Sequence, residues 1–153
     1  MTKSELLAFM RTHRLAVEAS VSASDAAQAA VVGIAVTESF ELVFDTIDTT
    51  RKADNIGRNP RVAFVIGGLT VGDERTVQYE GIADVPIGSE RERIKAAYFE
   101  AWPDGRDRVT WSGLVHVRVR PTWIRYSDYN TNSPVIIEFP EAQLRAWAIG
   151  TVE

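Results

Sequence analysis

Stretches in which polar and apolar residues alternate recur along the chain, and this two-residue period limits it to a fold made mainly of β-strands. Successive side chains of a strand point to opposite faces of a sheet, so each stretch predicts a strand with one buried face. Glycines between residues 67 and 72 mark one of the turns between them. The pattern predicts antiparallel hairpins, and the clearest strands cover residues 15–21, 61–67, 75–85 and 114–127.

Further apolar segments predict strands at residues 28–37 and 41–46, and a short strand at 135–139. The second strand is apolar on both faces from Ala29 to Val36. We therefore expect both of its faces to be buried, by the rest of a barrel or by a partner chain. The first three strands are expected to form an antiparallel meander with short turns.

Helical spacing and capping residues predict three short helices, at Lys3–His13, from Thr49 or Thr50 to about Asn59, and at Ser89–Ala101. The elements do not alternate as strand and helix, so a doubly wound parallel sheet is not expected. We predict a mainly β (α+β) fold with an antiparallel sheet of six to seven strands and two or three short flanking helices. Closure into a barrel would protect the edges of such a sheet.

A length of 153 residues suits one domain over residues 1–153, with a core at about 5–130 and a less sharply defined segment at 131–153. The net charge is -4, and the basic residues are scattered rather than gathered in one stretch. This argues against nucleic acid as a partner.

Cysteine is absent, which excludes disulfides, thiolate metal sites and cysteine nucleophiles. The two histidines, His13 and His116, have no metal-ligand spacing, so no metal site is expected. The N-terminus lacks the apolar segment of a signal peptide, and no stretch approaches the roughly 20 apolar residues that cross a bilayer. We expect a cytoplasmic protein with no membrane partner.

Arg51 and Lys52 are the first candidate site. They follow Thr46, Thr49 and Thr50 at the start of a predicted helix. A phosphate monoester is bound by cations, hydroxyl donors and free backbone N–H groups, and the N-terminus of a helix supplies the last of these. By spacing alone, the same pair also fits a solvated helix surface.

Six pieces of the chain, in order, resemble the pyridoxamine 5'-phosphate oxidase-like FMN-binding split-barrel proteins. The likeness spans roughly residues 5 to 130. The pieces are Arg14-Leu15-Ala16-Val17, the strand Gln28 to Val36, Phe44-Asp45-Thr46 to Thr50-Arg51-Lys52, Asn59-Pro60-Arg61-Val62-Ala63, Val77-Gln78-Tyr79-Glu80-Gly81 and Arg120-Pro121-Thr122-Trp123-Ile124-Arg125-Tyr126.

The resemblance implies a split β-barrel that binds flavin mononucleotide (FMN). Thr50, Arg51 and Lys52 match the family's phosphate-binding block, with Asp45 and Thr46 at the end of the preceding strand. The family's second strand lies along the flavin ring, which implies backbone contacts from Val32, Gly33 and Ile34. A flavin-contacting glutamine of the oxidases matches Thr76, and Gln78 lies on the same face.

The chain departs from the oxidases of this family at several positions. Ala30 and Ala35 stand where they carry an arginine and a lysine, and Ser127 stands where they carry a C-terminal tryptophan. The later arginine and histidine that bind the pyridoxal substrate have no counterpart. FMN binding is therefore expected, and pyridoxamine phosphate oxidation is not.

The leading hypothesis is an FMN-dependent oxidoreductase with a small-molecule redox substrate, acting as a homodimer with the cofactor site at the interface. No catalytic residue is named, because the flavin can accept a hydride directly. One alternative is a deazaflavin-dependent reductase of the same fold. Another is a binding domain without turnover that holds flavin or haem. Haem is less in keeping with the sequence, and its candidate ligands are His116 and His13.

Other side chains have an ordinary structural interpretation. Trp102, Trp111, Trp123 and Tyr126 could line a ligand pocket, Trp123 above all, but packing in the core or at a dimer interface is the favoured interpretation of such large aromatics. Glu80 and Glu138 have no predicted partner, so we expect both to be exposed carboxylates on strands.

Overall fold

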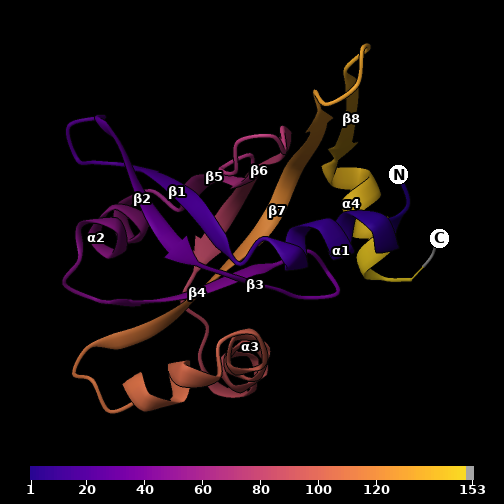
Figure 1. Ribbon diagram of the computed structural model, residues 1–153. Helices are drawn as coiled ribbons and strands as arrows, with labels where there is room; N and C mark the ends of the chain where they lie inside the picture. The colour runs from indigo at the N-terminus through magenta and orange to yellow at the C-terminus, as the bar shows by residue number, and fades with distance from the viewer. Residues whose placement is uncertain (151–153) are drawn as a thin grey trace.

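The computed structural model describes residues 1–150 and contains one curled antiparallel sheet (Figure 1). The strands follow the order β2-β1-β5-β6-β7-β4-β3, and β8 pairs with the far half of β7. This confirms the mainly β, antiparallel fold. The strands are β1 (Leu15–Val21), β2 (Ala27–Gly33), β3 (Ala35–Val36), β4 (Leu42–Ile47), β5 (Arg61–Gly67), β6 (Arg75–Asp84), β7 (Leu114–Asp128) and β8 (Val135–Pro140).

The two ends of the strand order, β2 and β3, are consecutive in the chain and separated only by Ile34. The Ile34 amide donates to the Arg14 carbonyl oxygen at 2.8 Å, where the chain passes from one end of the sheet to the other. This single segment therefore joins both ends of the sheet and makes it curl. The prediction of one continuous strand at 28–37 is wrong for this reason.

The expected burial of this segment is also only partly correct. Ala27, Ala29 and Val31 of β2 are exposed, whereas both residues of β3 are buried. The predicted meander breaks at the same place, because β4 pairs with β3 and β7 and not with β2. Two hairpins, β1–β2 and β3–β4, replace the three-stranded meander.

Within residues 1–150, four α-helices and one 3-10 helix surround the sheet. The predicted capping box between Thr2 and Glu5 starts α1, and Thr50 is the N-cap of α2. The C-terminal helix and the 3-10 helix were not predicted. No helix within residues 1–150 is long and apolar enough to cross a membrane. The helices are α1 (Lys3–Thr12), α2 (Arg51–Arg58), α3 (Gly88–Ala101), η1 (Pro103–Arg108) and α4 (Glu141–Ala148).

The main hydrophobic core lies inside the curl of the sheet. Phe64 packs edge-on against Tyr79 and is also in contact with Phe44, and all three are almost fully buried. The Tyr79 hydroxyl donates to the carbonyl oxygens of Phe40 and Val119, so its polar atom is paired within the core. Helices α1 and α4 lie side by side against one part of the sheet, and α2 lies near the β1–β2 hairpin (Figure 1).

Candidate functional site

The start of α2 gathers hydroxyl and basic side chains close to the end of β4. The Thr50 hydroxyl accepts the Ala53 amide hydrogen and lies 3.0 Å from the Thr46 hydroxyl. The N–H groups of Arg51 and Lys52 lie in the first turn, where an α-helix offers no acceptor for them. The helix dipole adds partial positive charge at this end. This local structure favours an anion.

A cavity of about 100 Å³ lies between the start of α2 and the β1–β2 hairpin. We call it the α2 pocket. Asn55 of α2 donates to the Ser20 hydroxyl at 3.1 Å and to the Gln28 side-chain oxygen at 2.9 Å, which ties the helix to both strands. The pocket is lined by Glu18, Ser20, Gln28, Ala29, Ala30, Thr50, Arg51 and Lys52.

The size of the α2 pocket limits what it can hold. Its volume corresponds to about three water molecules in the liquid. Pockets that enclose a whole small molecule are larger, at roughly 300–1,000 Å³. The α2 pocket can take a phosphate group, whereas a three-ring system must lie outside it.

The two basic side chains of the α2 pocket are available to a ligand. Within residues 1–150, neither the Arg51 guanidinium nor the Lys52 ammonium group makes a hydrogen bond or an ion pair. The third ionisable group is Glu18, which is only 1% exposed. Burial raises the pKa of the Glu18 carboxyl, although the Ser20 hydroxyl and the Lys52 charge act in the opposite direction. Its Oε1 atom is buried without a hydrogen-bond partner.

Asp45 does not share the α2 pocket with Thr46. Neighbouring residues of a strand face opposite sides of the sheet, so Asp45 faces α3 and η1. It accepts hydrogen bonds from the Tyr98 hydroxyl at 3.0 Å and from the Arg108 Nε at 2.9 Å. Burial and the nearby Asp45 charge raise the pKa of Tyr98 to about 12. Asp45 therefore anchors these two helices to the sheet.

The backbone at Val32, Gly33 and Ile34 is partly occupied by the chain itself. The Trp102 Nε1 donates to the Ile34 carbonyl oxygen at 3.0 Å, and the Ile34 amide already bonds Arg14. A Cβ atom at Gly33 would lie 2.8 Å from the Trp102 ring. The close approach that Gly33 allows is therefore used by Trp102, and neither polar backbone group of Ile34 is free for a flavin ring.

Thr76 and Gln78 lie on β6, away from the α2 pocket. Gln78 pairs with Val65 across the sheet, whereas Glu18 pairs with Phe64 and faces the core. Because side chains alternate along a strand, Gln78 and Glu18 lie on opposite faces of the sheet. Within one chain, the structure brings together Thr46, Thr50, Arg51 and Lys52 and leaves Asp45, Thr76 and Gln78 elsewhere.

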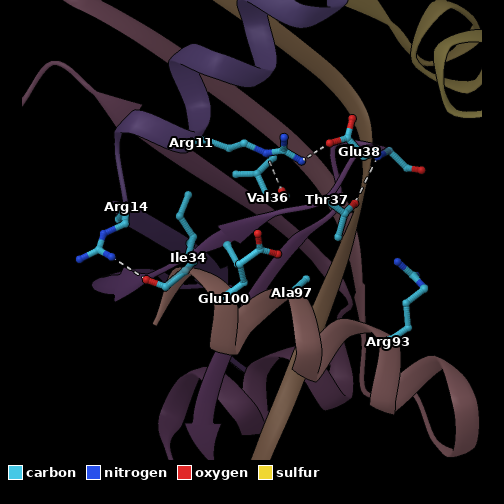
Figure 2. A pocket seen from close by; sticks show the side chains of 12 residues that line it. Arg11, Arg14, Ile34, Val36, Thr37, Glu38, Arg93, Ala97 and Glu100 are labelled. Atoms are coloured by element: carbon cyan, nitrogen blue, oxygen red, sulfur yellow. Dashed lines mark hydrogen bonds and ion pairs between the residues drawn. The ribbon is translucent and has the colours of Figure 1, made fainter. Parts of the chain in front are cut away.

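A larger cavity, of about 540 Å³, lies between the end of α1, β3 and α3 (Figure 2). We call it the α1–α3 cleft. Three arginines border it, and the sequence analysis assigned a role to none of them. Arg11 pairs with Glu38, Arg93 pairs with Glu41, and Arg14 donates to the Ala101 carbonyl oxygen. Arg11 and Arg14 lie on either side of the predicted end of the first helix. This position is the one sequence feature that could have pointed to a cleft there.

The remaining candidates have structural surroundings. His116 is buried beside Tyr98 and Phe99, and this burial lowers the pKa of the imidazole. Glu80 and Glu138 are exposed on their strands, as predicted. Trp102 packs on the backbone of Gly33 and Ile34 with Arg14 stacked above its ring, whereas Trp111 is largely exposed.

Comparison with known proteins gives one family and many structures of the same fold. A family model described as pyridoxamine 5'-phosphate oxidase matches residues 2–128. A heme binding protein from Mycobacterium smegmatis has a TM-score of 0.80 at 15% identity, over 95% of this chain and 61% of its own. The chain thus spans less than two thirds of that protein.

Two further structures cover most of both chains. A pyridoxamine 5'-phosphate oxidase-related, FMN binding protein from Nostoc punctiforme has a TM-score of 0.67 at 11% identity, over 90% of this chain and 87% of its own. General Stress Protein 26 from Bacillus anthracis has a TM-score of 0.66 at 20% identity, over 90% of this chain and 98% of its own. At these identities the likeness shows the fold alone. No curated protein matches the chain.

Proposed function

The chain belongs to the pyridoxamine 5'-phosphate oxidase family, and on that premise we propose that it is a cytoplasmic FMN-binding oxidoreductase. The observation that carries the proposal is the α2 pocket, where Arg51 and Lys52 form no hydrogen bond or ion pair within residues 1–150 and border a space of phosphate size. The proposed substrate is a small redox molecule other than pyridoxamine phosphate, because the chain lacks the residues that bind it.

In this proposal, the phosphate lies at the start of α2. The Arg51 and Lys52 side chains neutralise it, and the Thr50 and Thr46 hydroxyls and the first-turn N–H groups donate hydrogen bonds. Arginine suits two phosphate oxygens at once, whereas lysine acts as a compact charge. The two hydroxyls bond each other, and the Thr50 hydroxyl also accepts the Ala53 amide hydrogen.

The flavin ring would lie outside the α2 pocket, along β2. This strand stands at the end of the strand order, so one edge of its backbone pairs with no other strand of the sheet. Gly33 is the proposed backbone contact on that edge. Ile34 is withdrawn because its backbone is already bonded, and Val32 is withdrawn because the antiparallel register turns its N–H and C=O groups towards Ala16 of β1. Bound FMN supplies the electron chemistry, and the protein positions it and limits its contact with water.

We also propose a homodimer with the cofactor site at its interface. The outer face of the sheet carries exposed or half-buried apolar side chains in two rows that cross neighbouring strands. Such a face is suited to a two-fold contact with a second copy. Gln78 belongs to this face and could reach a nucleotide only across that contact. The rows are Val31, Val17 and Val65, and Ala29, Ala19 and Ala63.

The absorption spectrum of the purified protein tests the cofactor. We expect flavin bands near saturation after incubation with FMN, and mass analysis of the released chromophore should identify FMN. Apo protein titrated with FMN, riboflavin and a deazaflavin should prefer FMN, because riboflavin lacks the phosphate. A haem Soret band in place of the flavin bands, or preference for the deazaflavin, would replace this proposal with one of the alternatives.

Two more measurements test the reaction and the assembly. NADH or NADPH should bleach the bound flavin under anaerobic conditions, and no bleaching with either would argue for binding without turnover. Light scattering at micromolar concentration should give a dimer mass. Val31→Glu places a charge in the apolar row and should produce monomers, whereas the exposed Val71→Glu, on the β5–β6 loop, should not.

A further inference from the structure

The α2 pocket holds a buried acid that the phosphate site by itself does not explain. Glu18 lies in the middle of β1, is only 1% exposed and lines the pocket. Its Oε1 atom has no hydrogen-bond partner. Leaving a charged carboxylate oxygen buried and unpaired is costly, so such a group is expected to be neutral or to meet a partner supplied by a ligand.

Among the described residues that line the α2 pocket, two carry a charge besides Glu18. Arg51 and Lys52 come from α2, and within residues 1–150 neither approaches the Glu18 oxygens to ion-pair distance. On the sheet, Glu18 lies between Ala30 of β2 and Phe64 of β5, which cannot titrate. The remaining polar lining residues are Ser20, Gln28 and Thr50. Ser20 and Gln28 accept hydrogen bonds from Asn55, and the Ser20 hydroxyl also acts to lower the pKa of Glu18. Glu18 is thus the acid of an otherwise cationic pocket.

We propose that Glu18 is a further ligand-binding residue of the α2 pocket, which in its protonated form donates a hydrogen bond to a phosphate oxygen. The inference rests on the proposed function, because it takes the phosphate tail of FMN as the ligand. It also makes capture of that phosphate dependent on pH.

The physical reason is the contrast between the two forms of the carboxyl group. An ionised Glu18 would stand beside a phosphate as a like charge, and this repulsion costs binding energy in a desolvated site. A protonated Glu18 offers an O–H donor to an ionised acceptor, which is among the stronger hydrogen bonds. At a pH where Glu18 of the apo protein is ionised, binding therefore draws a proton from solvent onto Glu18, and affinity falls as pH rises through that range.

Two substitutions separate the donor role from the charge. Glu18→Gln keeps the shape and a permanent N–H donor, whereas Glu18→Leu removes both charge and donor. At pH 8.5 we expect FMN to bind Glu18→Gln on the order of tenfold more tightly than the wild type, and Glu18→Leu on the order of tenfold more weakly than Glu18→Gln. Far-UV circular dichroism and thermal unfolding check that both variants fold.

The phosphate of FMN itself titrates near pH 6, so the comparison is made between proteins at each pH. At pH 5.5 the difference between the wild type and Glu18→Gln should be smaller than at pH 8.5, because lower pH favours the protonated carboxyl group. Riboflavin should bind all three proteins alike. Calorimetry in buffers of different ionisation enthalpy should find about one more proton taken up per FMN by the wild type than by Glu18→Gln at pH 8.5.

The outcomes distinguish this inference from the function on which it rests. If no protein binds FMN at either pH, the proposed function falls and takes the inference with it. If FMN binds and the wild type and Glu18→Gln share one pH profile and one proton count, the inference alone is wrong. If Glu18→Gln and Glu18→Leu bind equally well, Glu18 acts only through its charge, and the hydrogen-bonding role is overturned.

Discussion

The α2 pocket and the α1–α3 cleft are both bordered by basic side chains, and they differ in what those side chains already do. The cleft is the larger, at about 540 Å³ against about 100 Å³. Its Arg11 and Arg93 are paired with carboxylates, and Arg14 is bonded to a carbonyl oxygen. Arg51 and Lys52 in the α2 pocket have no such partner within residues 1–150.

The two regions therefore differ in how far their polar groups are satisfied by the protein. The three cleft arginines are exposed, yet each bonds a carboxylate or carbonyl oxygen. Folded proteins pair nearly all of their buried polar groups. Glu18 is one of four residues within 1–150 with an unpaired buried side-chain atom, and it lies beside Arg51 and Lys52, which no protein group pairs in this part of the chain.

The largest expected effect compares the basic pairs of the two regions. Arg51→Ala combined with Lys52→Ala should weaken FMN binding by at least about a hundredfold, because two charge-assisted contacts are lost. The matched control, Arg11→Ala with Arg14→Ala in the cleft, should change the dissociation constant by less than about threefold. Fluorescence titration with FMN measures both. Equal losses would remove the distinction between the regions.

The next effect tests the packing beside the cleft. Gly33→Ala places a methyl group 2.8 Å from the Trp102 ring and should lower the free energy of unfolding by about 2 kcal/mol. Gly57→Ala is the matched control, because nothing lies within 4 Å of its added Cβ in the exposed part of α2. This change should stabilise the protein by about 0.5–1 kcal/mol. Urea denaturation measures the change in unfolding free energy of both variants. If both variants are stabilised, or both destabilised, the proposed clash between the methyl group of Gly33→Ala and the Trp102 ring is contradicted.

A smaller effect is expected where the cleft arginines act as structural ion pairs. Arg93→Ala leaves the buried Glu41 with the more distant Arg118 and should cost about 1 kcal/mol of unfolding free energy. Arg91→Ala, on the same helix and facing solvent, should cost less than about 0.5 kcal/mol. The difference should appear in urea midpoints at pH 7. A similar loss of unfolding free energy in both variants would mean that the ion pair between Arg93 and Glu41 does not stabilise the protein.

The smallest effect concerns Glu18 in the apo protein. Burial raises the pKa of Glu18 in the folded protein above the unfolded value of 4.5. The stability that this group contributes is therefore fully present below pH 4.5 and is lost as pH rises through the folded pKa. Relative to wild type, Glu18→Gln should therefore gain stability from pH 4 to pH 8. The exposed Glu138→Gln should show no such trend. A flat difference for Glu18→Gln would show that its carboxyl is not desolvated.

Much of the fold could be predicted because it is written in local patterns. The strands at 15–21 and 61–67 and the capped helices starting after Thr2 and Thr50 appear where alternation and capping residues indicate them. The segment at 28–37 was misjudged because hydrophobicity does not reveal which strands it joins. Its break at Ile34 depends on the Arg14 carbonyl oxygen, twenty residues earlier, and on Trp102.

The candidate site was predicted in part for the same reason. Thr50, Arg51 and Lys52 are neighbours in the chain, so one helix start brings them together. Asp45 was included with Thr46, although the strand turns them to opposite faces. Nothing in the sequence distinguishes Glu18, since a glutamate in an alternating strand is usually exposed.

Local patterns account for the antiparallel strands, the capped helices and the position of Arg51 and Lys52 at the start of α2, because backbone preferences and capping act over a few residues. Three features depend on the folded sheet: β2 and β3 lie at opposite ends of the strand order, Asp45 anchors two helices, and Glu18 lies buried beside two cations that are unpaired within residues 1–150. Burial and pairing depend on residues far apart in the chain, and only the folded sheet brings those residues into contact.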